Sequence, residues 1–186
     1  MNKKLILIIV LVVALITMAF FVSSHKRYAW RMDYRIGYAP CKFHVPEGWI
    51  PAEKTAYAAF QKTISKDLPQ SNINIQIQKL SEVRGSHENI SIDDYVNELL
   101  LKELTQIHKA TIVSVRDFTV DHFKAKDIVF ENSLTLKGLT RDLKNRMIIF
   151  IAGKYVYSFT LGSFEKDYDI ASKDFQSMAS SFHFQK

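Results

Sequence analysis

Cys41 and His44 form the residue pair best suited to covalent chemistry, because a thiol beside an imidazole is the arrangement of a cysteine nucleophile and its general base. Both lie in Cys41–Val45, where apolar and polar residues alternate as in a half-buried strand. Residues three apart on a strand point to opposite faces of the sheet. We therefore predict a buried, inert thiol and an exposed imidazole, and no catalytic dyad.

Other residues able to bind ligands do not gather into motifs. The six histidines are scattered singly, without a second ligand at metal-site spacing, so metal binding would need histidines that the fold assembles. Asp93 and Asp94 are adjacent acids, and we interpret them as capping residues of a helix, whose first turn favours acids. Lys124 and Lys126 are interpreted as solvated turn residues. The six glycines are isolated, which argues against a phosphate-binding loop. We predict no catalytic residue, no cofactor and no metal.

Residues 1–24 are predicted to be a membrane-targeting segment. Thr17 is the single polar residue between Leu5 and Val22, and two lysines precede this run. A helix of that length covers most of a hydrocarbon core of about 30 Å. We expect an uncleaved signal anchor that forms a transmembrane helix, and the small residues at 22–24 leave cleavage open as the alternative.

Residues 25–40 are rich in aromatic and basic side chains, and we predict a tether that lies on the membrane surface. Aromatic rings favour the headgroup region, and arginines attract anionic lipid. The predicted membrane-interface residues are Arg27, Tyr28, Trp30, Arg31 and Arg35. Tyr34, Ile36 and Tyr38 leave an alternative open, in which this half of the tether forms an extra strand or packs on the domain. Basic residues flank both ends of the apolar run, so they do not fix the orientation; we expect export of the C-terminal domain to the periplasmic or extracellular side.

The part of the chain after residue 24 has a formal net charge of +4, because two of the 25 basic residues and none of the 19 acidic residues lie before it. Its basic residues are interspersed with acids, which argues against a nucleic-acid partner. With one cysteine, the chain forms no internal disulfide.

Residues 41–186 are predicted to form a single α+β domain. Ile73, Ile75 and Ile77 alternate with polar residues over 72–78, the pattern of a half-buried strand. From residue 111 to 162, strand-like runs alternate with short turns, which indicates antiparallel hairpins. A change of parity along 113–120 predicts a β-bulge near residues 116–117.

Two amphipathic helices are predicted to cover the sheet, one on each face. The first begins with a capping box at Ser91 and Asp94. One apolar stripe is expected along it: Ile92, Val96, Leu99, Leu100, Leu104 and Ile107. The second covers about 166–181. Its apolar face is expected to contain Tyr168, Ala171, Phe175, Met178, Ala179 and Phe182.

Motifs at both ends of the domain resemble one family. Residues 43–49, read as F-x-x-P-x-G-W, resemble the opening of the PsbP-like superfamily, which includes PsbP of photosystem II, a Ran-binding release factor and DcrB-type bacterial envelope proteins. Residues 155–159, 181–184 and 91–95 resemble its closing strand, its C-terminal end and the start of its central helix. The resemblance implies an α/β/α sandwich around an antiparallel sheet. We predict that Trp49 is at least partly buried at the corner after the first strand and packs near the C-terminal helix or its neighbouring strands.

The same resemblance implies binding and assembly rather than catalysis. We expect a noncatalytic, single-pass envelope module whose partners are membrane lipid and an unidentified protein. A bitopic structural subunit of a secretion or division machine is the first alternative, although such domains usually begin with helices. An uncharacterised hydrolase is the second, and it would require a pocket with converging polar groups.

Overall fold

The computed structural model describes residues 28–32, 38–52, 58–66, 70–83, 85–87, 89–136 and 139–185. The expected anchor lies outside these ranges. Within them, no helix has both the length and the hydropathy that a membrane crossing requires.

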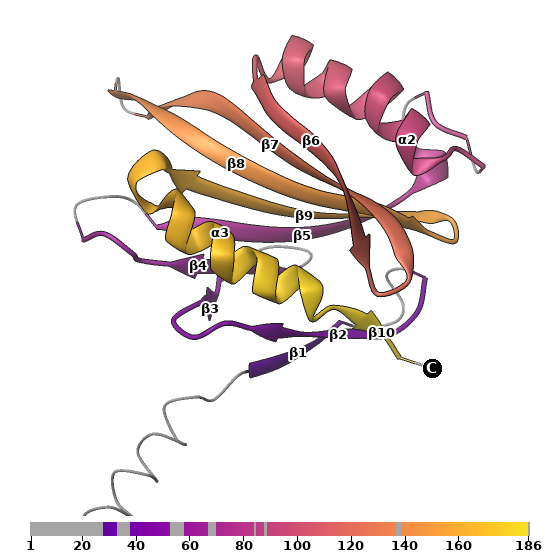
Figure 1. Cartoon of the computed structure of the whole chain (residues 1–186), viewed down its shortest axis with the longest axis horizontal. Coiled ribbons are helices and arrows are strands. Elements are labelled where there is room, and N and C mark those ends of the chain that lie inside the picture. The colour runs from indigo at the N-terminus through magenta and orange to yellow at the C-terminus, as the bar shows by residue number, and fades with distance from the viewer. Residues whose placement is uncertain are drawn as a thin grey trace, which may run out of the picture.

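Two antiparallel sheets form the domain (Figure 1). The large sheet contains, in spatial order, β3 (Ile50–Pro51), β4 (Ala58–Lys62), β5 (Ser71–Lys79), β9 (Tyr155–Phe164), β8 (Leu139–Ala152), β7 (Phe123–Leu136) and β6 (Thr111–Val120). The small sheet contains β1 (Tyr28–Met32), β2 (Cys41–Val45) and β10 (His183–Phe184). The predicted hairpins are therefore confirmed, since β6 to β9 follow one another along the chain.

One face of the large sheet is covered by α3 (Glu165–Ser180) and the small sheet (Figure 1). The core on this side is rich in aromatic rings, among them Phe43, Phe60, Phe150, Tyr157, Phe159 and Phe182. Every apolar residue predicted for the C-terminal helix face is buried. Trp49 is also buried, and its Nε1–H donates to Asp174 Oδ2 of α3 at 2.9 Å, as the predicted corner requires.

The opposite face is covered by a continuous helix over residues 92–107, which we call the central helix (Figure 1). It consists of α2 (Ile92–Asp94), η2 (Tyr95–Leu100) and η3 (Glu103–Ile107), with Leu101 and Lys102 between the last two. The Ser91 hydroxyl accepts from the Asp94 amide at 3.1 Å, so the predicted cap is present. The short helix η1 (Leu80–Glu82) connects β5 to this side. One helix on each face makes the predicted sandwich.

Neighbouring residues of β8 show that the sheet is covered on both faces. Ile148 and Phe150 lie in the core beneath α3, whereas Ile149 lies in the core beneath the central helix. This confirms the expectation from the near-continuous apolar run at residues 147–151.

The predicted bulge near residues 116–117 is wrong. The register shifts between Ile112 and Ser114 instead. Val115 pairs with Ile128 on the central-helix side, while Val120 lies in the core on the α3 side. Because β6 presents apolar residues to both faces of the sheet, the switch of its apolar residues from odd to even positions needs no bulge near residues 116–117.

Part of the expected tether belongs to the small sheet. The backbone of Tyr28–Met32 pairs with β2, so that Tyr28 lies opposite Val45 and Met32 opposite Cys41. The strand comes from the aromatic and arginine half of the segment. In the other half, for which packing on the domain was the open alternative, Tyr38 does pack on the domain: its ring contacts Phe123 and Phe184, and its amide donates to Tyr157 Oη.

Candidate functional site

The central helix has unusually wide turns. The amide of Leu101 donates to Val96 O, and that of His108 donates to Glu103 O, five residues back in each case. Such π-type turns are wider than the 3.6 residues of an α-helix. Residues four apart therefore align along the helix axis.

This alignment divides the expected apolar stripe into two rows. The inner row faces the sheet and is buried: Ile92, Val96, Leu100 and Leu104. The outer row contains Tyr95, Leu99, Glu103 and Ile107. Tyr95 is buried, Leu99 is half-buried, and Ile107 is 70% exposed. Leu99 still packs against the core beneath the helix, so the predicted stripe is wrong only at Ile107, which was placed on it at α-helical spacing.

The outer row forms one wall of a groove of about 640 Å³, which we call the outer-row groove. The opposite wall comes from the end of β5 and the segment after it: Gln78, Glu82, Val83 and Gly85. Gly85 has φ +82°, and a Cβ atom there would lie 3.2 Å from Leu99 Cδ2. Glycine thus permits both the turn and the close approach of this wall to the helix.

The outer-row groove is acidic within the described chain. Its charged lining residues are Glu82, Glu98 and Glu103 against the single cation Lys102. Burial raises the pKa of Tyr95, and the charge of Glu103 raises it further. The described residues of the groove therefore combine apolar side chains, carboxylates and a neutral phenol, a combination suited to binding.

Comparison with known proteins identifies the family. A family model described as PsbP matches residues 34–184. The chain belongs to the PsbP family. A search of curated proteins found no match.

Solved structures agree with the PsbP fold. LpqN of Mycobacterium tuberculosis, involved in cell envelope biogenesis, superposes with a TM-score of 0.60 at 12% identity, covering 90% of this chain and 96% of LpqN. PsbP (CyanoP) of the cyanobacterium Synechocystis superposes with a TM-score of 0.56 at 17% identity, covering 84% of this chain and 92% of CyanoP. PA94 of Pseudomonas aeruginosa, a protein of unknown function, superposes with a TM-score of 0.52 at 16% identity, covering 81% of this chain and 94% of PA94. At these identities the likeness shows the fold alone.

Cys41 and His44 occupy opposite faces of β2 in this PsbP domain. Cys41 is buried and His44 is exposed, as predicted from the strand pattern. Burial raises the pKa of the Cys41 thiol to about 12, so it is protonated at neutral pH and unsuited to nucleophilic attack. Across the described ranges, no group of three or more His, Cys, Asp or Glu side chains is arranged to hold a metal ion.

The membrane-interface prediction remains a prediction. Arg27 and Arg35 lie outside the described residues. The backbone of Tyr28, Trp30 and Arg31 belongs to β1, where Trp30 lies opposite Phe43.

Sequence reasoning missed a buried ion pair beneath α3. Arg146 donates from Nε and Nη2 to the two carboxylate oxygens of Asp127, each at 2.9 Å. Its Nη1 donates to Ser172 Oγ and, at 3.4 Å, to Gln176 Oε1 of α3. Since both charges are buried and bonded to each other, we assign them to holding α3 on the sheet.

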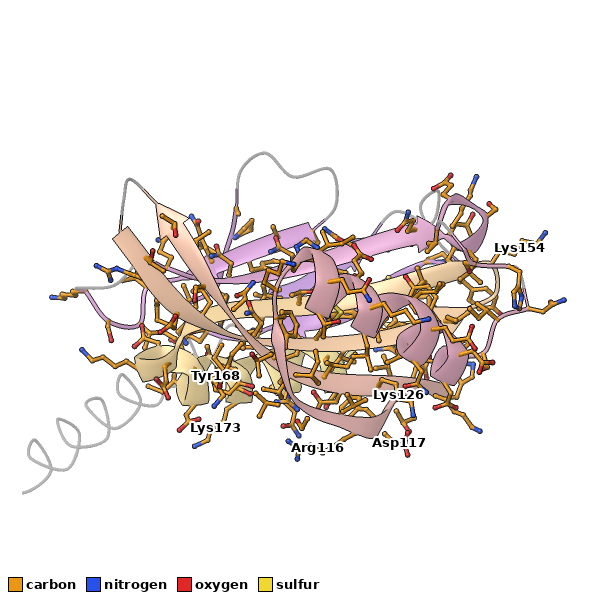
Figure 2. The ribbon with its side chains drawn as sticks, turned by 90° about the horizontal axis from the view of Figure 1, so that it is seen from above. Arg116, Asp117, Lys126, Lys154, Tyr168 and Lys173 are labelled. Atoms are coloured by element: carbon orange, nitrogen blue, oxygen red, sulfur yellow. The ribbon has the colours of Figure 1, made fainter. Side chains whose placement is uncertain are left out.

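A second missed network holds the start of the central helix. The Lys126 ammonium pairs with Asp93 and, at 2.7 Å, with Asp117 of β6. Figure 2 shows Asp117 and Lys126 together at the β6 edge, with Arg116 nearby. Lys126 is 16% exposed, so the prediction of a solvated turn residue is wrong for it. Its hydrogen bond lowers the pKa of Asp117.

Proposed function

We propose that this PsbP-family chain is a membrane-anchored, noncatalytic envelope protein that holds a segment of a protein partner near the membrane. The supporting observation is the exposed Ile107, on the same wall as the half-buried Leu99, at a groove large enough to receive side chains from another chain. In the core, by contrast, each apolar residue predicted on α3 is buried. An apolar side chain left exposed at a groove favours binding.

The envelope location is supported by the fold shared with LpqN and by the apolar run at residues 5–22. We expect the chain to remain in membranes with residues 1–24 attached. Intact-mass measurement of the protein from a carbonate-washed membrane fraction tests this. A soluble species that begins at His25 would replace the anchored protein with a secreted one.

Lipid contact by Arg27, Tyr28, Trp30, Arg31 and Arg35 is part of this proposal. The chain has two tryptophans, so in a Trp49→Phe variant only Trp30 fluoresces as an indole. In proteoliposomes with brominated anionic lipid we expect quenching of Trp30 relative to unbrominated vesicles. Replacing the three arginines by serine should reduce the quenching at low salt. Equal emission in both vesicle types would assign the segment to the domain alone.

Docking of a protein partner is tested by a photo-crosslinking amino acid placed at Ile107 of the full chain in intact cells. Ile170 on α3 is a matched control, because it is also an exposed isoleucine on a helix. Its exposed fraction is 54%, against 70% for Ile107. We expect a discrete adduct from position 107 and none from position 170. Identical adduct patterns from both positions, or none from either, would contradict the proposed function.

A further inference from the structure

We infer that the outer-row groove receives an amphipathic helix of a partner protein, with an apolar face flanked by lysine or arginine. This inference rests on the proposed docking function and specifies the chemistry of the partner. It follows from two properties of the groove: the position of its apolar residues on the central helix, and its charge.

The apolar residues stand in one line. Leu99 and Ile107 belong to the same row, two turns apart, which places them on the order of 10 Å from each other along the helix axis. Two apolar side chains seven residues apart on a helix have nearly the same spacing. A partner helix lying along the row can therefore contact both residues with successive apolar side chains.

The charges favour a basic partner. Glu82 lies on one wall, and Glu98 and Glu103 lie on the other, against Lys102. Cations beside the apolar face of the partner would meet these carboxylates at the rim. Charge pairs at a rim speed association and make binding sensitive to salt, whereas the apolar contacts slow dissociation.

The wall formed by the central helix favours a helical occupant. An extended peptide binds by adding a strand to a free sheet edge, through backbone hydrogen bonds. The central helix lines the groove with side chains, among them Leu99 and Ile107, and its own backbone is hydrogen-bonded within the helix. A partner helix likewise satisfies its own backbone hydrogen bonds and needs only side-chain contacts. The row of Leu99 and Ile107 therefore favours a helix over an extended peptide.

The test uses the full chain in phosphatidylcholine nanodiscs, with the δ1 methyl groups of isoleucine labelled for NMR. The probe is a synthetic amphipathic helix of about 15 residues, near the length at which isolated helices become stable, with leucines on one face and lysines beside them. Two matched peptides replace every lysine by glutamate or every leucine by serine. Site-specific methyl signals separate binding at the groove from binding of the peptide to lipid.

We expect the lysine–leucine peptide to shift the Ile107 methyl signal, with a dissociation constant on the order of 10 μM, and to leave the Ile170 signal unchanged. Both matched peptides should bind at least tenfold more weakly. The double variant Glu98→Lys/Glu103→Lys should reverse the preference in favour of the glutamate peptide. The variant Ile107→Ser should weaken binding about tenfold, as followed by the Leu99 methyl signals in protein that is also labelled at the leucine methyl groups.

Three results would overturn the inference. The first is an Ile107 signal that does not move at millimolar lysine–leucine peptide, and the second is equal binding of the two charge variants. The third is conversion of an oligomer into a monomer by Ile107→Ser, which would assign the groove to a second copy of this chain. If crosslinks form at position 107 but the basic peptide does not bind, docking stands and the proposed partner chemistry fails. If neither is seen, both fail.

Discussion

The two faces of the large sheet are held in different ways. Beneath α3, polar side chains reach across the interface at several points: Trp49 and Lys62 bind Asp174, Ser65 binds Asp167, and Arg146 binds Ser172. The central helix packs on a core that is mainly aliphatic but includes Phe130, and its start is tied by Lys126 to Asp93. One helix is fixed by apolar packing and by directional bonds, and the other mainly by apolar packing.

This difference separates two tasks within one domain. Directional bonds fix the position and rotation of α3, because each requires a particular geometry. Apolar contacts are less directional, so the central helix can take wide turns and still bury its inner row. The end of its outer row, at Ile107, then remains exposed. Four predictions test the comparison, in order of decreasing effect.

The largest effect is expected from Trp49→Ala on the α3 side. The change removes a buried ring and its hydrogen bond to Asp174, and should lower the free energy of unfolding by about 4 kcal/mol. Urea unfolding measures this value. Trp49→Phe is the control, since it keeps most of the apolar area and should cost about 1 kcal/mol for the lost bond. A loss below about 1 kcal/mol for the alanine variant would contradict burial of the corner.

The next effect concerns the ion pair beneath α3. Asp127→Ala leaves the buried Arg146 guanidinium without its carboxylate and should cost about 3 kcal/mol. The double variant Asp127→Leu/Arg146→Met removes both charges and should recover most of that loss. A double-mutant cycle by chemical denaturation measures the coupling. A double variant less stable than Asp127→Ala would show that the pair is not held as a buried unit.

A smaller effect separates the two rows of the central helix. Leu104→Ala removes a buried inner-row side chain and should cost about 2.5 kcal/mol. Ile107→Ala removes an exposed outer-row side chain and should change stability by less than about 0.5 kcal/mol. Thermal and urea unfolding of both variants give the two losses in the free energy of unfolding, which can then be compared. Comparable losses would restore the single buried stripe expected from α-helical spacing.

The smallest effect is the pH dependence of the surface network at Lys126. The hydrogen bond from Lys126 holds the pKa of Asp117 below its ordinary value near 4, so its stabilisation is present above that pH and is lost as the pH falls through the lowered pKa. The difference in Tm between wild type and Lys126→Gln should therefore be seen at pH 7 and shrink below about pH 4. Melting curves by circular dichroism at low salt measure it. A difference that grows on acidification would have the wrong sign.

Much of the fold was predictable because it depends on local patterns. Alternation identified Ile73, Ile75 and Ile77 as one buried face, and Ser91 with Asp94 identified the start of the central helix. These signals depend on residues a few positions apart. The motifs that carry the PsbP-like resemblance are local as well. They lie in strands and at a helix end that pack in the core.

The candidate site was less predictable because it depends on the width of the helical turns. The regular spacing of four between Ile92, Val96, Leu100 and Leu104 is the signal that could have indicated two rows, but it differs little from the α-helical repeat. The pairing of Asp127 with Arg146 arises across two strands, and the pairing of β1 with β2 depends on distant contacts. Local patterns do not specify such pairs.

The pairing of β1 with β2 also sets how far the domain can lie from position 24 of the chain. When β1 lies on β2, three residues separate position 24 from Tyr28, a span of at most about 10 Å. When β1 detaches, the thirteen residues 25–37 span up to about 45 Å, because the Tyr38 amide still donates to Tyr157 Oη. With residues 1–24 held in a membrane, as proposed, tension on the chain from its N-terminal side would load the Tyr28–Val45 pair first, so β1 would peel away from that end. A five-residue strand would then act as a latch on the reach of the domain, holding the groove at short range or releasing it to several times that distance.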